Sequence, residues 1–354
     1  MKKINFTPLI SSLLAILAGL IIGFLILLIC NTKEAVPGFL TIIMGPFTHG
    51  LEGIGDVLYY ATPLILCGTS VGFAFRTGLF NIGGSGQYLM GAFGAVYVGL
   101  MCEFLGPMQW VVALIVACIL GGICGGITGA LKAYFNVNEV ITSIMLNYIS
   151  LYFVNMTIRG NAMLFNPARN ESRNIKEVAE VPQLGLDKLF QGSSVNIGII
   201  IAILVAILIY IILEKTVFGY ELKACGFNKN ASRYAGINEN KSIVYSMIIA
   251  GAICGLAGGI AYLSGTGKHI EIKDVIPAEG FNGISVALLG VSNPIAIIFS
   301  GLFIAYLTAG GFYLQLFHFS KEIIDIIIAI IIYFSAFSLL VTNIISRKSK
   351  KKKE

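Results

Sequence analysis

Long apolar runs follow one another along nearly the whole chain, separated by short polar stretches. A helix needs about 20 apolar residues to cross the hydrocarbon core of a bilayer, and runs of this kind recur from end to end. They predict ten membrane spans: 9–30, 55–75, 79–100, 108–130, 138–157, 195–213, 242–263, 280–292, 294–315 and 322–346. The pattern indicates an all-α polytopic membrane protein.

Composition agrees with this pattern. Hydrophobic residues make up 56% of the chain, charged residues make up 12%, and the mean hydropathy is +0.86. A water-soluble core does not require such values, so the composition places the protein in a bilayer. The seven cysteines include no CxxC pair and lie mostly in apolar runs, which favours packing over metal binding or redox chemistry.

Basic residues predict the orientation of the chain. Lys2, Lys3 and the tail 347–354 place both termini in the cytoplasm, which requires an even number of spans. One membrane domain then covers residues 1–346, with an extracellular insert at 158–194 and a cytoplasmic loop at 214–241. Because the tail carries much of the net charge of +6, the charge indicates a membrane surface and not nucleic-acid binding.

The segment 280–292 is too short to cross a bilayer alone, and it ends at Asn293-Pro294. We expect a half-helix there, although a full crossing stays open. Non-helical backbone at membrane depth is tolerated only where protein or a water-filled cavity satisfies it. Such a piece therefore predicts a translocation path.

A weak internal repeat relates two parts of the chain. The motif Cys67-Gly68-x-x-x-Gly72 reappears as Cys254-Gly255-x-x-x-Gly259, and a Phe-Asn pair follows each copy, at Phe80-Asn81 and Phe281-Asn282. In the ten-span topology the copies run in opposite directions, which is typical of two inverted halves. Chance recurrence of Gly and Ala is the alternative.

Glycines at four-residue spacing mark two of the spans. One row is Gly121, Gly125 and Gly129, and the other is Gly251, Gly255 and Gly259. Rows of this kind leave bare ridges on which helix backbones approach closely, so we expect them to pack helices.

The sequence offers no catalytic centre. His49, His269 and His318 lie far apart, and Gly265-Thr-Gly-Lys268 lacks the earlier glycine and the final Ser or Thr of a phosphate-binding loop. We therefore expect no enzyme, no metal site and no cofactor bound by this chain, with ATP and Mg²⁺ held by a partner.

Ionisable residues lie near span ends, which argues against coupling to a proton gradient. The polar residues at depth are uncharged: Asn81, Ser85, Gln87, Thr142, Ser143, Asn147, Tyr148, Asn282 and Ser285. Amides and hydroxyls suit a neutral solute such as a nucleoside or sugar. We expect Asn81, Ser85, Gln87, Asn147, Asn282 and Ser285 to line its path; the alternative is that they bond neighbouring helices.

The polar stretch from Phe218 to Asn238 resembles the cytoplasmic coupling segment of ABC importer permeases. The pattern is carried by Gly219, Glu221, Leu222, Ala224, Gly226, Asn228, Ala231, Ser232, Arg233, Tyr234, Ala235, Gly236 and Ile237. Ser232 departs from the two alanines common there. The resemblance implies that an ATPase touches Glu221, Gly226, Asn228, Arg233, Tyr234 and Gly236. We expect a short amphipathic helix that presents Tyr220, Leu222, Phe227, Tyr234 and Ile237.

Gly78-Leu-Phe-Asn-Ile-Gly83 followed by Gly86-Gln87 is similar to the signature of bacterial nucleoside and simple-sugar permeases, within the branched-chain amino acid and ribose permease superfamily. The outer segment from Arg159 to Pro182 looks like the insert of the larger of two paired permeases, and Gly280–Gly290 also matches. The resemblance implies a heteromeric importer in the bacterial cell membrane, with an ABC ATPase, a second permease and an extracellular substrate-binding lipoprotein.

The expected function is that of the permease subunit of an ATP-driven nucleoside importer. Two alternatives remain open. One keeps the family and changes the solute to a simple sugar or a branched-chain amino acid. The other is a secondary transporter or channel that works without an ATPase, which buried charges would favour and this sequence scarcely offers.

Overall fold

A computed structural model describes residues 7–336, and the chain forms two compact units. One comprises Met1–Val57 with Phe303–Glu354, and the other comprises Leu58–Leu302. We describe each unit by itself. The basic residues Lys2 and Lys3, the tail 347–354 and the end of the expected span 322–346 lie outside the described residues.

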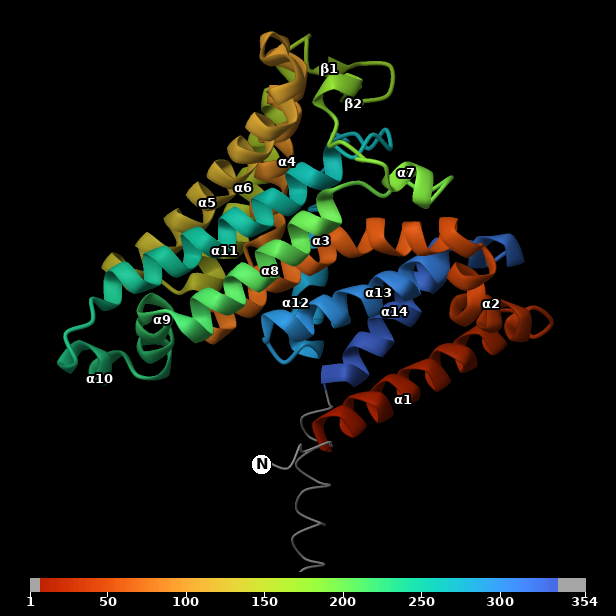
Figure 1. Ribbon diagram of the computed structural model, residues 1–354, viewed down its shortest axis with the longest axis horizontal. Helices are drawn as coiled ribbons and strands as arrows, with labels where there is room; N and C mark the ends of the chain where they lie inside the picture. The colour runs from red at the N-terminus through yellow and green to blue at the C-terminus, as the bar shows by residue number, and fades with distance from the viewer. Residues whose placement is uncertain (1–6, 337–354) are drawn as a thin grey trace, which may run out of the picture. The chain divides into compact units, whose positions relative to one another are not determined.

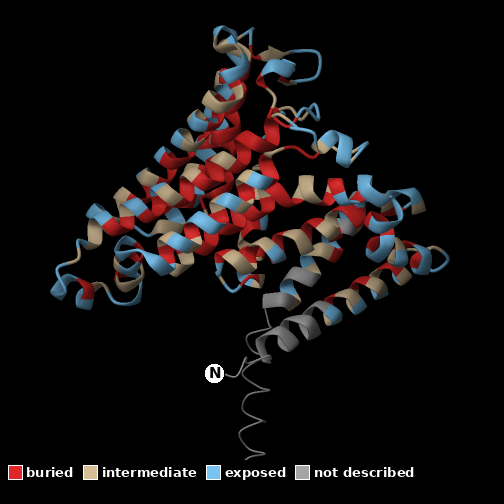
Figure 2. Ribbon diagram, in the orientation of Figure 1, coloured by how far each residue is buried: buried red, intermediate tan, exposed pale blue. Residues whose placement is uncertain are grey.

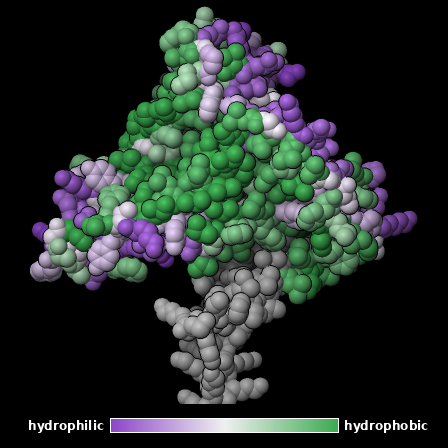
Figure 3. All heavy atoms as spheres, in the orientation of Figure 1, coloured by the Kyte–Doolittle hydropathy of each residue, from purple (hydrophilic) through white to green (hydrophobic). Residues whose placement is uncertain are grey.

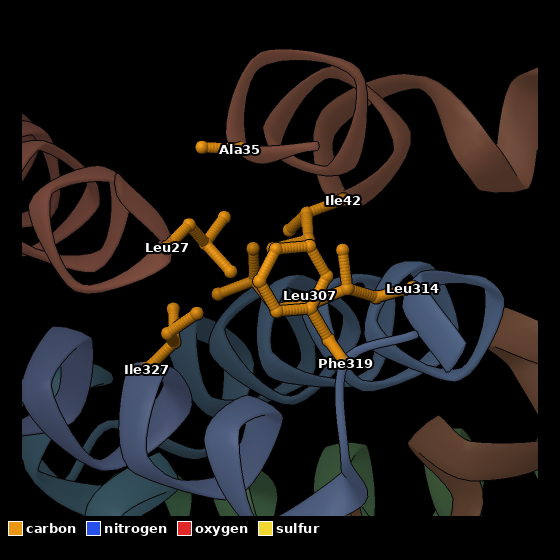
Figure 4. Close-up of a cluster of buried hydrophobic side chains, with 7 residues drawn as sticks. All are labelled: Leu27, Ala35, Ile42, Leu307, Leu314, Phe319 and Ile327. Carbon is orange, nitrogen blue, oxygen red and sulfur yellow. The ribbon is translucent and has the colours of Figure 1, made fainter. Parts of the chain in front are cut away.

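The first unit is built on helices from both ends of the chain (Figure 1). Its helices are α1 (Thr7–Cys30), α2 (Ala35–Thr48), η3 (Gln315–Phe317), α14 (Lys321–Ala336) and parts of α3 (Gly50–Arg76) and α13 (Pro294–Leu314). Figure 4 shows its buried core: Leu27, Ala35, Ile42, Leu307, Leu314, Phe319 and Ile327. Apolar side chains from both ends of the chain therefore pack into one small hydrophobic core.

Helix α2 was absent from the sequence expectations. Its sequence contains Pro37, Gly38, Gly45 and Pro46, which weaken a helical signal. Packing compensates, because Gly38 lies directly against Leu314 and Phe319. Gly50, which follows His49 and is the first residue of α3, has a φ of +61°, a value that favours glycine and turns the chain into α3.

The second unit contains the remaining helices. They are α4 (Gly84–Met101), η1 (Glu103–Met108), α5 (Gln109–Phe135), α6 (Glu139–Arg159), η2 (Glu177–Ala179), α7 (Leu186–Leu189), α8 (Gly198–Lys215), α9 (Val217–Phe227), α10 (Lys229–Tyr234), α11 (Glu239–Tyr262) and α12 (Glu279–Leu289), with the rest of α3 and α13. A short antiparallel hairpin, β1 (Phe165–Asn166) and β2 (Glu171–Ser172), is its only sheet within residues 7–336.

Six helices in the described part of the chain are long and apolar enough to cross a membrane. They are Gly50–Arg76, Glu103–Phe135, Glu139–Arg159, Gly198–Lys215, Glu239–Tyr262 and Pro294–Phe317. This establishes an all-α membrane protein. The expected span 79–100 begins later than expected, at Gly84, because Leu79–Gly83 is not helical. Helix α12 has 11 residues and is about 16 Å long, half of a bilayer core.

The glycine rows pack α5 against α11, as the sequence predicted. A side chain on Gly121 or Gly125 would collide with the backbone of Gly251 or Met247, and one on Gly255 would collide with the Ala117 carbonyl. The helix backbones therefore touch along this line. Many residues of α11 are buried, and they are red in Figure 2.

Polar atoms gather at two ends of this unit, around the β1–β2 hairpin and around α9 and α10, with a hydrophobic surface between them (Figure 3). At the hairpin end, the loop 263–278 runs beside β2: the Ser172 nitrogen donates to the Ile270 carbonyl at 2.9 Å, and the Ile272 nitrogen donates to the Asn170 carbonyl at 3.0 Å. These bonds join the expected insert 158–194 to the chain between α11 and α12.

Candidate functional site

The first feature of the site is the meeting of two helix N-termini. Gly280, in the first turn of α12, lies so close to Gly84 and Ser85 at the start of α4 that no side chain fits between them. Beside them lies Cys254, about 22 Å along α11 from its start. Because α11 is one of the membrane-crossing helices, α4 and α12 both begin deep within the helical layer.

The two copies of the sequence repeat meet at this place. The side chains of Cys67 and Cys254, which occupy equivalent positions in the two copies, are neighbours. Gly283 of α12 packs directly on the backbone of Cys67. The two copies of the motif therefore lie side by side.

Buried amides hold the non-helical stretch before α4. Asn81 and Gln87 exchange two hydrogen bonds of 2.8 and 3.0 Å, and Asn81 also donates to the Ser70 hydroxyl at 3.4 Å. From α6, Asn147 accepts from the Gly86 nitrogen at 2.8 Å and donates to the Ile82 carbonyl at 3.2 Å. The structure thus brings three of the expected path residues together, and each uses its amide within the chain.

The other expected path residues are Ser85, Asn282 and Ser285, and Ser143 is a further polar residue at depth. The hydroxyls of Ser85 and Ser143 are buried and have no hydrogen-bond partner among the described residues. On α12, Asn282 is exposed and Ser285 is half-buried. These four side chains therefore keep hydrogen-bonding capacity that the rest of the described chain does not use.

Sequence reasoning missed a charged pair near the start of α12. The Lys268 ammonium donates to a Glu279 carboxylate oxygen at 2.7 Å, and it lies 4.9 Å from the centre of the Tyr262 ring and 3.4 Å from the Tyr88 hydroxyl. Burial lowers the pKa of Lys268, but the Glu279 carboxylate and the Tyr262 phenol outweigh burial and leave the pKa raised. The only sequence signal was the glycine-flanked lysine itself.

The segment 214–241, which we call the coupling segment, forms two short helices in place of the single helix expected. Thr216 caps α9 by accepting from the Gly219 nitrogen at 3.0 Å, and Asn228 caps α10 by accepting from the Ala231 nitrogen at 3.1 Å. Gly236 has a φ of +82°, which favours glycine. Asn228 and Gly236 therefore shape the segment.

The coupling segment is fixed to the end of α3. Gly226 and Gly78 lie backbone to backbone, and Gly78 has a φ of +75°. Glu214, at the end of α8, pairs with Arg76 of α3 and, at 3.1 Å, with Lys223 of α9. The two motifs that the sequence singled out, around Gly78 and around Gly226, are thus in direct contact.

The outer face of the coupling segment is open. Tyr234 and Phe227 are 95% and 89% exposed, Tyr220 and Arg233 are also exposed, and Glu221 is half-buried. The expectation for Leu222 was wrong: it is 1% exposed because it faces the chain's own helices. The exposed aromatic side chains on this surface offer contact area to a partner. The ribbon of α9 and α10 is largely pale blue and tan in Figure 2.

Three relatives of known name resemble nearly the whole chain. The guanosine ABC transporter permease protein NupP of Bacillus subtilis is 38% identical over 98% of each chain. The nucleoside ABC transporter permease protein NupB of Lactococcus lactis is 32% identical over 93% of this chain and 91% of its own. The glucose ABC transporter permease protein TsgB13 of Haloferax volcanii is 29% identical over 91% of this chain and 85% of its own.

Bacillus subtilis and Lactococcus lactis each have a second permease that matches this chain at lower identity: NupQ in the first and NupC in the second. No solved structure matches the chain. The model of one protein family, described as the permease component of branched-chain amino acid transport systems, matches residues 53–336. That match covers most of the chain and includes both the meeting N-termini and the coupling segment. The chain therefore belongs to this family of multi-pass membrane permeases.

Proposed function

We propose that this chain is the permease subunit of an ATP-driven importer of nucleosides. The observation that carries the proposal is the contact of Gly226 with Gly78, because it links an exposed partner surface to the stretch leading to Asn81 and α4. Movement of the coupling segment would be passed to the N-terminus of α4 through residues 78–83. The names of NupP and NupB support a nucleoside as the solute.

The partners follow from this function. An ATPase subunit would bind the exposed face of the coupling segment and hold ATP and Mg²⁺, and a lipoprotein would deliver the solute from outside. A second permease would complete the path, which the paired names NupP with NupQ and NupB with NupC support. Catalysis of ATP hydrolysis would lie outside this chain.

The topology we propose has ten membrane helices in two inverted halves, with both termini in the cytoplasm of a bacterial cell. The Cys67–Cys254 contact supports the inverted relation, as do the two N-termini that meet at depth. The coupling segment would face the cytoplasm, and the β1–β2 hairpin would face outward. Helix α12 would then be a half-helix that lines the path.

The expected site residues take different roles in this proposal. Asn81, Gln87 and Asn147 would hold the non-helical stretch that moves, while Ser85, Asn282 and Ser285 would offer hydrogen bonds to the solute. On the coupling segment, Gly226, Asn228 and Gly236 would set the backbone, and Glu221, Arg233 and Tyr234 would contact the ATPase.

The test uses the assembled transporter in proteoliposomes. Arg233→Ala and Tyr234→Ala should abolish ATP-driven uptake of radiolabelled guanosine, while the complex still inserts and the ATPase alone stays active. Asn230→Ala, at an exposed position of the same helix, is the matched control. Unchanged uptake in both variants would refute the coupling role.

The solute and the energy source have their own controls. Excess unlabelled nucleoside should block uptake, while glucose or leucine should leave it unchanged. Competition by glucose would assign the solute named for TsgB13 instead. Uptake without ATP that a proton ionophore abolishes would establish a secondary transporter.

A further inference from the structure

The chain between α11 and α12, residues 263–278, is held along its length by segments that lie far away in the sequence; we call it the strap. At its start, the Val181 nitrogen of the insert 158–194 donates to the Leu263 carbonyl at 2.8 Å. Farther along, residues 270–272 pair antiparallel with the end of the hairpin, as a third strand-like segment beside β2. The strap is therefore tied to the insert at two places.

Side chains of the insert add to the backbone pairing. The Asn170 amide donates to the Ile272 carbonyl at 2.8 Å, and the Ser172 hydroxyl accepts from the Ile270 nitrogen at 3.0 Å. Asn170 itself has a φ of +55°, a conformation that asparagine tolerates better than most residues. These bonds, together with the backbone bonds, fix the register of the strap against the hairpin.

One residue of α6 holds the end of the strap. The Asn155 amide donates to the Lys273 carbonyl at 3.1 Å, and Asn155 is buried. On the same helix, Asn147 donates in the same way to the Ile82 carbonyl, in the stretch before α4. A rise of 1.5 Å per residue separates the two asparagines by about 12 Å along α6. One helix therefore bonds to the stretch that leads into each of the two meeting N-termini.

The connection from the strap to α12 is short and stiff. Residues 274–278 separate Lys273 from α12, and they include Pro277, whose ring fixes its own φ and restricts the residue before it. The ion pair between Lys268 and Glu279 joins the strap a second time to the first residue of α12. Displacement of the strap should therefore displace the first turn of α12, which is the turn that meets α4.

We propose that the insert sets the position of α12 through the strap, and that Asn155 and Asn170 are positioning residues for Asn282 and Ser285 on that helix. The arrangement matches the opposite end of the unit, where the coupling segment contacts the stretch before α4. Each meeting N-terminus is thus reached from a different polar end. The effect on solute binding rests on the proposed function; the control of α12 by the strap does not.

The first test is hydrogen exchange of the purified, assembled transporter, followed by mass spectrometry. Asn170→Gly removes the amide and suits the positive φ. We expect exchange at least about threefold faster, both in 270–273 and in α12 at 282–289. Asn166→Ala is the matched control, because that side chain accepts from the Ala168 nitrogen of its own turn. Faster exchange confined to 270–273 would overturn the proposal.

Uptake kinetics distinguish a positioning role from a structural one. Asn155→Leu keeps a similar volume and removes the donor, so a displaced α12 should raise KM for guanosine at least about fivefold while the maximal rate changes less than about twofold. A residue that only stabilises the fold would lower the maximal rate, because less transporter is active, and would leave KM unchanged. That result would overturn the role of Asn155. Asn170→Gly gives the same comparison if Asn155→Leu does not assemble.

A covalent bond between the strap and the hairpin provides a rescue. Glu171 and Glu271 lie directly opposite each other and are flanked by the backbone bonds, a position at which Cα atoms are about 4.5 Å apart. Glu171→Cys with Glu271→Cys can therefore form a disulfide. Added to Asn170→Gly, this disulfide should return KM and the exchange of α12 to within about twofold of the parent protein treated with the same oxidant, and a reductant should abolish the rescue.

The remaining outcomes separate the two levels of the proposal. A disulfide that forms and restores neither KM nor exchange would overturn the control of α12 by the strap. Failure of the wild-type complex to import any nucleoside would refute the proposed function. The exchange of α12 would then still decide whether the insert sets the position of that helix.

Discussion

The α5–α11 contact and the coupling segment use glycine in opposite ways. Between α5 and α11, glycines on both helices remove side chains, so the two backbones touch at Gly121, Gly125, Gly251 and Gly255. In the coupling segment, Gly226 makes one such contact with Gly78, while the outer face of α9 and α10 stays exposed. The first arrangement fixes two helices to each other, and the second fixes one edge of a segment and leaves its other face for a partner.

The largest effect is expected where the contact is tightest. Gly125→Ala places a methyl group against the Met247 carbonyl, so the helices must separate, at a cost of about 3 kcal/mol of unfolding free energy or loss of folded protein. Gly122→Ala is the matched control on the same helix, because a Cβ atom on Gly122 would lie 3.5 Å from the nearest atom, the Ile248 carbonyl oxygen. Yield of monodisperse protein by size-exclusion chromatography checks both; equal yields would contradict the tight packing.

Breaking the Gly226 contact should cost less and act locally. A Cβ atom on Gly226 would lie 2.7 Å from the Gly78 nitrogen, and the exposed segment can shift to relieve this. We expect Gly226→Ala to cost about 1–2 kcal/mol and to lower ATP-driven uptake sharply. Gly226→Ala with wild-type uptake would show that the segment does not act through this contact. Ala224→Ser, on the same helix, controls for a general effect on α9.

The charged pair Lys268–Glu279 should contribute about 1–2 kcal/mol, because removing one partner leaves a half-buried charge beside aromatic rings. Glu279→Gln and Lys268→Met should each lower the thermal midpoint, and the double variant should recover part of the loss. Additive losses in the double variant would show that the two groups act independently.

The pH dependence of the same pair follows from the direction of the shift. The pKa of Lys268 is raised in the folded protein, so its stabilising contribution is complete below the ordinary pKa of 10.5. The contribution is lost only as pH rises through the higher folded value. Thermal midpoints should therefore show no titration of this lysine between about pH 6 and 9. A midpoint difference between wild type and Lys268→Met that changes within this range would contradict the assignment.

The smallest effect is expected at Glu214, which pairs with Arg76 and Lys223 near the coupling segment. All three side chains are partly exposed, so Glu214→Gln should cost less than about 1 kcal/mol, and the loss should shrink in high salt. Thermal midpoints at low and high salt check this. A loss that salt does not change would show that the cluster is shielded from solvent.

Much of the fold could be predicted because membrane helices follow from apolar length alone. The four-residue spacing of glycines such as Gly121 and Gly125 also predicted that they pack one helix against another. Contacts between distant segments could not be predicted in this way: the bond between Asn147 and Gly86 joins residues 61 positions apart. The bond between Asn81 and Gln87 is local, but it depends on the non-helical stretch between them. Leu222 was expected to face a partner and is buried within the chain. An amphipathic pattern shows that a helix face is apolar, but it does not show whether a partner or the chain's own helices cover that face.

The candidate site was predictable only in part for the same reason. Asn81, Gln87 and Asn147 stood out as polar residues at depth, and the structure places them together around the start of α4. Lys268 did not stand out, since a loop lysine is ordinarily solvated; only the fold places it beside Glu279 and Tyr262.

The meeting of α4 and α12 also bears on electrical insulation. A helix N-terminus carries a partial charge of about +0.5, and here two of them lie together at depth without a basic side chain between Gly84 and Gly280. Their summed field disfavours a sodium ion or a hydronium ion and leaves a neutral molecule unaffected, while the Glu279 carboxylate in the first turn of α12 is paired with Lys268. A passage built around these termini would admit an uncharged solute and hinder the leakage of small cations, which would dissipate the membrane potential.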